Sequence, residues 1–80
     1  MQLRLVQGPE GAPNFCFGTY DKETNKRVDF VQSDYNWADL ANKLGAELPD
    51  LDEVGTSKYL AAAFDWLSDH DGETFEVYDE

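Results

Sequence analysis

Hydrophobic and polar residues alternate along four short stretches of the chain, as they do in strands that bury one face. These stretches span residues 2–7, 14–20, 27–32 and 74–78. Leu3 and Leu5 share one side of the first stretch, and Phe15 and Phe17 share one side of the second. Turn-forming residues fill positions 21–26, so the second and third stretches are predicted to form a β-hairpin.

After residue 32 the apolar spacing lengthens to that of a helix, with hydrophobic residues three and four positions apart. Residues 33–45 carry one such stripe, made of Trp37, Leu40, Ala41 and Leu44. Residues 57–70 carry a second stripe, made of Leu60, Ala63, Phe64 and Leu67 and widened by Tyr59, Ala62 and Trp66. Residues 46–54 lack this spacing and are expected to form a connecting loop.

Capping residues indicate where the first predicted helix ends and where the second begins and ends. Gly45 stands where a glycine commonly follows the last helical turn, in a left-handed conformation. Thr56 or Ser57 can cap the start of the second helix, because either hydroxyl can accept a free backbone N–H. Gly72 is expected to end that helix.

The order of elements is therefore βββααβ, which predicts a small antiparallel sheet with two helices packed on one face, an α+β fold. In the last strand Phe75 and Val77 would point inward and Glu76 outward, and this strand is expected beside the first. The 80 residues suit a single domain, residues 1–80. Hydrophobic residues make up 41% of the chain and aromatic residues 14%, which is sufficient for a folded core.

Net charge is the unusual feature of the composition, with 17 acids against six bases for a total of −11. Residues 1–44 carry six acids and five bases, a net of −1. Residues 45–80 carry eleven acids and a single base, Lys58, a net of −10. A charge asymmetry of this size bears on partners and solubility rather than on fold.

The most acidic stretch, SDHDGETFEVYDE at residues 68–80, admits several interpretations. A calcium-binding EF-hand loop needs an oxygen ligand at position 1 and a glutamate at position 12. With Gly72 at the glycine position of that loop, Leu67 and Tyr78 occupy those two places, so calcium is not expected. A solvated acidic tail would have no use for apolar residues at strand spacing among the acids. A folded acidic surface remains.

Local electrostatics separate two sets of acids around the second predicted helix. Three acids precede it: Asp50, Asp52 and Glu53. The helix dipole favours them there by about 0.3–1 kcal/mol, so stability alone explains them. Asp65 and Asp69 are like charges one turn apart, and Asp69 and Asp71 crowd the end of the helix that disfavours anions. Residues that break local rules without evident compensation are candidates for function.

This charge suggests a protein that imitates nucleic acid. Ten net charges correspond to roughly 17 Å of duplex DNA, and a domain of this size is about 30 Å across. We therefore predict a non-enzymatic inhibitor that occupies a basic nucleic-acid-binding site on a host or defence protein, with each carboxylate standing in for a phosphate. The candidate partner-binding residues are Asp65, Asp69, Asp71, Glu73, Glu76, Asp52, Glu53 and Asp50.

Catalysis finds little support in the sequence. Cys16 lies among aromatic residues in a predicted strand, where an inert buried thiol is usual, and His70 is placed to cap a helix end. A P-loop, a dinucleotide-binding glycine motif and a nucleophile elbow are all missing from the sequence, and we expect no catalytic residue, cofactor or metal. The six bases are too few for direct nucleic-acid binding.

The sequence contains neither a signal-peptide pattern nor an apolar run long enough to span a membrane, and its one cysteine cannot form an internal disulfide. These features favour a cytoplasmic protein, as a monomer or homodimer, with no membrane partner.

An alternative to the nucleic-acid mimic is a general protein-interaction or accessory domain that binds through its aromatic residues, with its acids serving solubility. Adaptation to high salt is a third explanation of the acidity.

The segments VQSDYNWADLANKLG and AFDWLSDHDGETFE resemble a loosely defined group of small bacterial and phage proteins. Members share a V-Q-S-D-aromatic start to a short helix and an A-x-x-W-L-D/S-x-H end to a second one. The resemblance covers about half of the chain and implies no particular activity. In size and charge the chain is also similar to acidic phage inhibitors that imitate nucleic acid, of the anti-restriction and anti-CRISPR type.

Overall fold

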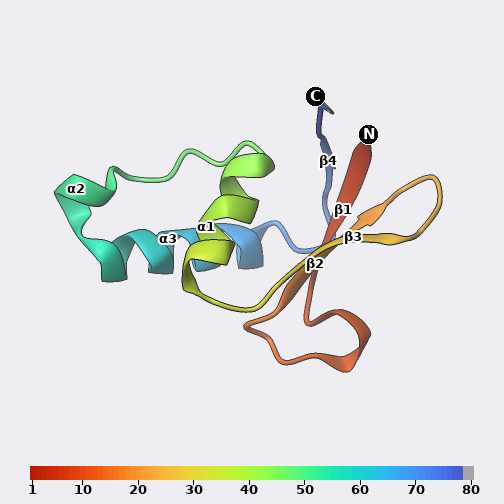
Figure 1. Ribbon diagram of the computed structural model, residues 1–80, viewed down its shortest axis with the longest axis horizontal. Helices are drawn as coiled ribbons and strands as arrows, with labels where there is room; N and C mark the ends of the chain where they lie inside the picture. The colour runs from red at the N-terminus through yellow and green to blue at the C-terminus, as the bar shows by residue number, and fades with distance from the viewer. Residues whose placement is uncertain (79–80) are drawn as a thin grey trace.

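The computed structural model describes residues 1–78 of the chain. Its strands are β1 (Gln2–Gln7), β2 (Phe17–Asp21), β3 (Arg27–Val31) and β4 (Thr74–Glu76). Its helices are α1 (Asp34–Lys43), α2 (Leu51–Val54) and α3 (Thr56–Asp69), and a 3₁₀ turn, η1, spans Pro9–Gly11. The strands form one antiparallel sheet in the order β3-β2-β1-β4, and the helices lie to one side of it (Figure 1). The predicted α+β class and the predicted pairing of the last strand with the first are both confirmed.

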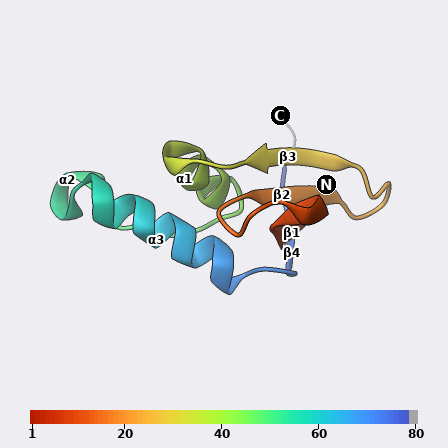
Figure 2. The ribbon, with the colours of Figure 1, turned by 90° about the horizontal axis from the view of Figure 1, so that it is seen from below.

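The core lies between the sheet and the two long helices. Leu3 and Leu5 of β1 are fully buried on the face of the sheet that the helices cover. Figure 2 shows the four strands stacked in order, with α1 beside the β3 end of the stack and α3 beside the β1 and β4 end. The buried cluster consists of Leu3, Leu5, Phe17, Ala38, Leu40, Ala41, Leu44, Ala63, Leu67 and Val77.

Aromatic contacts join α1, α3 and the sheet at one point. The ring of Phe64 on α3 meets Phe17 of β2 edge to face, with centroids 5.4 Å apart. The same ring meets Trp37 of α1 at 5.0 Å, also edge to face. Such pairs contribute about 0.5–1.5 kcal/mol beyond the burial of their surface. Phe64 therefore fixes the position of α3 against both of its neighbours.

Two predictions about the segment before α3 are wrong. Residues 46–54 were expected to form a loop, but α2 forms there because the Asp50 carboxylate accepts a hydrogen bond from the Asp52 amide at 2.9 Å and so caps a short helix. The residue that precedes α3 is Gly55, at φ +85°, rather than Thr56 or Ser57. The prediction for the first helix is confirmed, because Gly45 follows α1 with φ +96°.

The second strand begins at Phe17, three residues later than predicted, because residues 13–16 form a turn closed by the Cys16 N–H and the Pro13 carbonyl at 3.0 Å. Phe15 therefore points away from the core and is 47% exposed, contrary to the expected pairing of its side with that of Phe17. Its carbonyl accepts a hydrogen bond from the Trp37 indole N–H at 2.8 Å, which ties this turn to α1.

The two faces of β3 differ from one another in exposure. Asp29 is half-buried on the side of the helices, where its carboxylate accepts hydrogen bonds from Thr19 Oγ1 and Lys43 Nζ, both at 2.8 Å. Val28 and Phe30 are 42% and 38% exposed. A β-bulge in the pairing of β2 with β3 interrupts the register between these strands.

The last strand is shorter than predicted and ends at Glu76. Its pattern is nevertheless as expected, with Phe75 half-buried, Glu76 exposed and Val77 buried. The Val77 N–H donates to the Met1 carbonyl at 2.8 Å, so the pairing with β1 continues past the strand.

Candidate functional site

Four candidate acids lie around the C-terminal end of α3, and we call Asp65, Asp69, Asp71 and Glu73 the α3 acidic end. All four are exposed. Asp65 and Asp69 sit one helical turn apart, a rise of about 6 Å, so their charges face solvent close together. From residue 59 to residue 78 the chain has five acids and no lysine or arginine. Cations are therefore absent from this segment of the sequence.

Asp71 has a structural partner that the sequence did not reveal. Its Oδ1 accepts a hydrogen bond from the Gln7 backbone N–H at 2.9 Å, at the end of β1. The Gln7 side chain also donates to Ser68 Oγ at 3.1 Å and to the Asn14 carbonyl at 2.9 Å. The predicted conflict at Asp71 therefore does have a compensation, because this acid fastens the end of α3 to the sheet. The contact joins residues 64 positions apart, and no local pattern signals it.

The neighbouring acids differ in how far they are engaged. The backbone of Glu73 is fixed, since its carbonyl accepts from the Leu5 N–H at 2.9 Å, while its side chain is exposed. Glu76 lies on β4, where its carboxylate is 3.6 Å from the Met1 amino group. Glu76 therefore contributes to an ion pair at the edge of the sheet rather than to the α3 acidic end.

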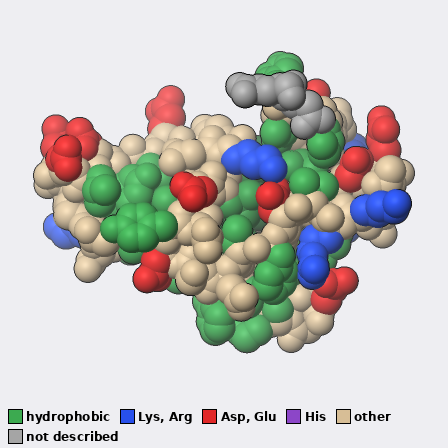
Figure 3. Space-filling model, in the orientation of Figure 1, with side chains coloured by type: hydrophobic (Ala, Val, Ile, Leu, Met, Phe, Trp, Pro, Cys, Tyr) green, Lys and Arg blue, Asp and Glu red, His purple; other side chains and the backbone are tan. Residues whose placement is uncertain are grey.

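The remaining candidates form a second group, the α2 acids, which are Asp50, Asp52 and Glu53. Figure 1 shows α2 at one end of the long axis of the molecule, and α3 runs from there toward β4. The 14 residues of α3 span about 21 Å, which separates the α2 acids from the α3 acidic end. Figure 3 shows acidic side chains at both ends of one face and between them. The eight predicted residues thus form two groups and an isolated glutamate.

Basic residues lie mainly in the sheet and its hairpin. Arg27 pairs with Glu10 at 2.8 Å and lies 5.0 Å from the centre of the Phe30 ring. Arg4 lies 5.9 Å from the centre of the Tyr20 ring. These contacts place both arginines on aromatic surface of the sheet. Arg4 pairs in register with Thr74, the residue after Glu73, so one arginine of the sheet lies on the strand next to the α3 acidic end.

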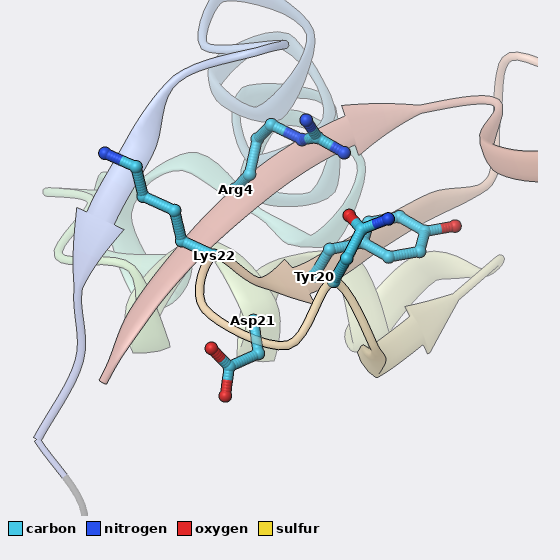
Figure 4. Close-up of a pocket in the computed structure, with 5 residues that line it drawn as sticks. Arg4, Tyr20, Asp21 and Lys22 are labelled. Carbon is cyan, nitrogen blue, oxygen red and sulfur yellow. The ribbon is translucent and has the colours of Figure 1, made fainter.

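The surface of the described part of the chain has small hollows. One, of about 40 Å³, is lined by Arg4, Tyr20, Asp21, Lys22 and Asn25. In Figure 4 the Asp21 carboxylate and the Lys22 amine point in different directions rather than toward a common point. Another, of about 120 Å³, lies between β3 and α1. Both are below the roughly 300 Å³ of a typical small-molecule site.

Cys16 and His70, the one cysteine and the one histidine of the chain, both lie within the packed structure. Cys16 is a buried free thiol. The His70 ring stacks on Trp66 with centroids 4.1 Å apart, and its Nδ1 lies 2.7 Å from the Trp66 carbonyl. His70 is the C-cap of α3, as predicted, whereas Gly72, which was expected to end that helix, follows the cap by two residues with φ +87°.

Within residues 1–78 no three histidine, cysteine or acidic side chains are grouped so that they could hold a metal ion. The helices of this same region are all too short or too polar to cross a bilayer.

Comparisons with family models, with curated protein sequences and with solved structures gave no match to this chain. The resemblance to small bacterial and phage proteins therefore stays a prediction. Function has to be inferred from the charges, contacts and exposed surfaces of the chain itself.

Proposed function

We propose that the protein is a non-enzymatic binding protein, an inhibitor whose acidic surface occupies a basic nucleic-acid-binding site on a host or defence protein. The observation that carries this proposal is the α3 acidic end. Among the described residues, Asp65, Asp69 and Glu73 have exposed side chains and no salt-bridge partner. Inhibitors of the anti-restriction and anti-CRISPR type are the class of protein that this charge suggests.

Energetics favour a functional explanation for Asp65 and Asp69. Like charges one turn apart on a helix are destabilising by about 0.2–0.5 kcal/mol. Asp69 also lies in the last turn of α3, where the helix dipole disfavours an anion by about 0.3–1 kcal/mol. Neither side chain donates or accepts a hydrogen bond within residues 1–78. A basic partner would offset these costs.

The distance between the two acidic groups supports a nucleic-acid-like mode of binding. One strand of duplex DNA carries a charge about every 3.4 Å, so the length of α3, about 21 Å, corresponds to about six phosphates. The α2 acids and the α3 acidic end lie at the two ends of that length. A basic groove that follows a nucleic-acid strand would meet negative charge at both ends of α3.

The test compares two double variants that change net charge equally. Asp65→Asn/Asp69→Asn removes two charges at the α3 acidic end, and Glu23→Gln/Glu47→Gln removes two exposed charges elsewhere. Each protein is immobilised and exposed to a bacterial lysate in about 0.1 M salt and in about 1 M salt, where the Debye length falls from about 10 Å to about 3 Å. We expect the retained proteins to be nucleic-acid-binding proteins that duplex DNA displaces. High salt should abolish their retention. Of the two double variants, Asp65→Asn/Asp69→Asn should lose them and Glu23→Gln/Glu47→Gln should keep them.

Stability measurements separate this role from a structural one. Asp65→Asn/Asp69→Asn should raise the free energy of unfolding by a few tenths of a kcal/mol, because it relieves repulsion, while it weakens binding. Equal loss of binding in both double variants would contradict the assignment to α3. Binding that survives high salt but fails with Tyr35→Ala, a residue 55% exposed on α1, would instead favour the aromatic interaction domain.

A further inference from the structure

β3 is an edge strand of the sheet, since β2 is its neighbour on one side and no described strand lies on the other. Figure 2 shows β3 at one end of the stack of strands, and this end faces the viewer in Figures 1 and 3. Backbone N–H and C=O groups along such an edge can pair with another extended chain. Charged residues and bulges commonly protect edge strands. β3 has the charged Arg27 and Asp29 and the bulge described above, but it also exposes Val28 and Phe30.

A groove runs beside this edge, between β3 and α1. It has a volume of about 120 Å³ and is lined by Asp29, Val31, Asn36, Asp39, Leu40 and Lys43. Val31 is half-buried and supplies apolar surface above the buried Leu40, and Asp39 is exposed without a hydrogen-bond or ion-pair partner among residues 1–78. Lys43 and Thr19 both bind Oδ2 of Asp29, so in the described region its Oδ1 keeps its capacity to accept.

We infer that β3 binds an extended basic peptide as a fifth strand. Side chains alternate between the two faces of a sheet, so every second peptide residue would lie over the groove and the others over the opposite face. A lysine or arginine over the groove would lay its aliphatic stem on Val31 and bring its charge to Asp39. An apolar residue on the opposite face would contact Val28 and Phe30. The peptide therefore alternates basic and apolar residues.

Charge selects a basic peptide over a second copy of the protein. Each copy carries a net charge of −11, and antiparallel pairing of β3 with itself about its central residue would set Asp29 against Asp29. Like charges directly opposite each other in neighbouring strands are destabilising. A basic segment meets attraction from Asp39 and from Oδ1 of Asp29. This site shares no residue with the α3 acidic end and does not rest on the proposed function.

The test uses a fluorescent synthetic peptide of alternating lysine and valine, with binding followed by anisotropy. A peptide with proline in place of valine keeps the positive charge, but it lacks every second backbone N–H, and the fixed φ of proline, about −65°, disfavours the extended conformation of an added strand. A peptide of alternating glutamate and valine reverses the charge. We expect only the lysine–valine peptide to bind tightly, with the proline peptide at least about tenfold weaker, since the backbone hydrogen bonds supply affinity.

Two variants of equal charge change locate the site. Asp39→Lys should weaken the lysine–valine peptide by about tenfold or more, because like charges would meet in the groove. Asp39→Asn should give a smaller loss. Glu47→Lys changes net charge by the same amount as Asp39→Lys, but Glu47 is exposed in the segment after α1 and does not line the groove, so this variant should alter affinity less than about twofold. Circular dichroism of each variant checks that it is folded.

Amide hydrogen exchange reports strand addition directly. Bound peptide should slow exchange at amides of β3 on its outer edge and leave the amides of α3 unchanged. Equal affinity for the lysine–valine and proline peptides would overturn the inference, because it would show attraction without strand pairing. Equal effects of Asp39→Lys and Glu47→Lys, protection confined to α3, or a stable dimer paired through β3 would also overturn it.

Discussion

Replacement of Asp71 distinguishes a structural carboxylate from a binding one. In the native protein Asp71 Oδ1 accepts from the Gln7 amide at 2.9 Å, and this contact fastens the segment after α3 to the end of β1. Asp71→Ala removes the acceptor, whereas Asp71→Asn keeps an acceptor oxygen in the same place and removes the charge. The two variants therefore separate the hydrogen bond from the negative charge.

The expected magnitudes follow from two opposing terms. A hydrogen bond to a charged group stabilises by about 1.5–3 kcal/mol, while an anion close to the end of a helix is disfavoured by about 0.3–1 kcal/mol. Asp71→Ala should therefore lower the free energy of unfolding by about 1–2 kcal/mol. Asp71→Asn should change it by less than about 0.5 kcal/mol, because the weaker neutral hydrogen bond is offset by relief of the repulsion.

Urea unfolding followed by tryptophan fluorescence measures both variants, since Trp66 stacks on His70 close to the altered loop. For a domain of this size a loss of about 1 kcal/mol lowers Tm by about 4–8 °C, so thermal unfolding gives an independent check. If Asp71→Ala is as stable as the native protein, the contact with Gln7 does not stabilise the fold. If Asp71→Asn is as damaging as Asp71→Ala, the charge and not the acceptor matters.

Two further substitutions test the core and the end of α1. Leu67→Ala should destabilise by about 2–5 kcal/mol, because Leu67 is fully buried, whereas Leu51→Ala at a position 37% exposed should cost less than about 1 kcal/mol in the same urea titration. Gly45→Ala should cost about 1–2 kcal/mol, because φ is +96° there although the added methyl group meets no atom within 4 Å; a loss below about 0.3 kcal/mol would show that the turn relaxes.

Elements defined by local periodicity were predicted well from the sequence. The buried faces of β1, α1 and α3 follow from apolar spacing alone, and Leu3, Leu40 and Leu67 are all in the core. Gly45 was found because a glycine after an apolar stripe commonly ends a helix. These signals lie within a few residues of the feature that they predict, so one sequence is sufficient to detect them.

Features that depend on contacts between distant residues, or on a single capping hydrogen bond, were not predicted from the sequence. The side of β3 that faces the helices carries Asp29, whose burial depends on Thr19 and Lys43, and strand propensity gives no indication of this. The Asp50 cap that creates α2 was interpreted only as a favourable charge. The contact of Asp71 with Gln7 joins residues 64 positions apart, so the sequence could not show that Asp71 has a structural partner while Asp65 and Asp69 have none among residues 1–78.

The position of β1 between β2 and β4 has a consequence for how the protein is made. During synthesis β1, β2 and β3 emerge first, but Leu3 and Leu5 stay uncovered until α3 follows them, and β1 keeps an open edge until β4 arrives. A nascent or truncated chain would thus expose two free strand edges and an apolar sheet face at once, a combination prone to aggregation. Residues 1–44 carry a net charge of only −1, so charge repulsion between such unfinished chains becomes strong only when the acidic C-terminal half has been added.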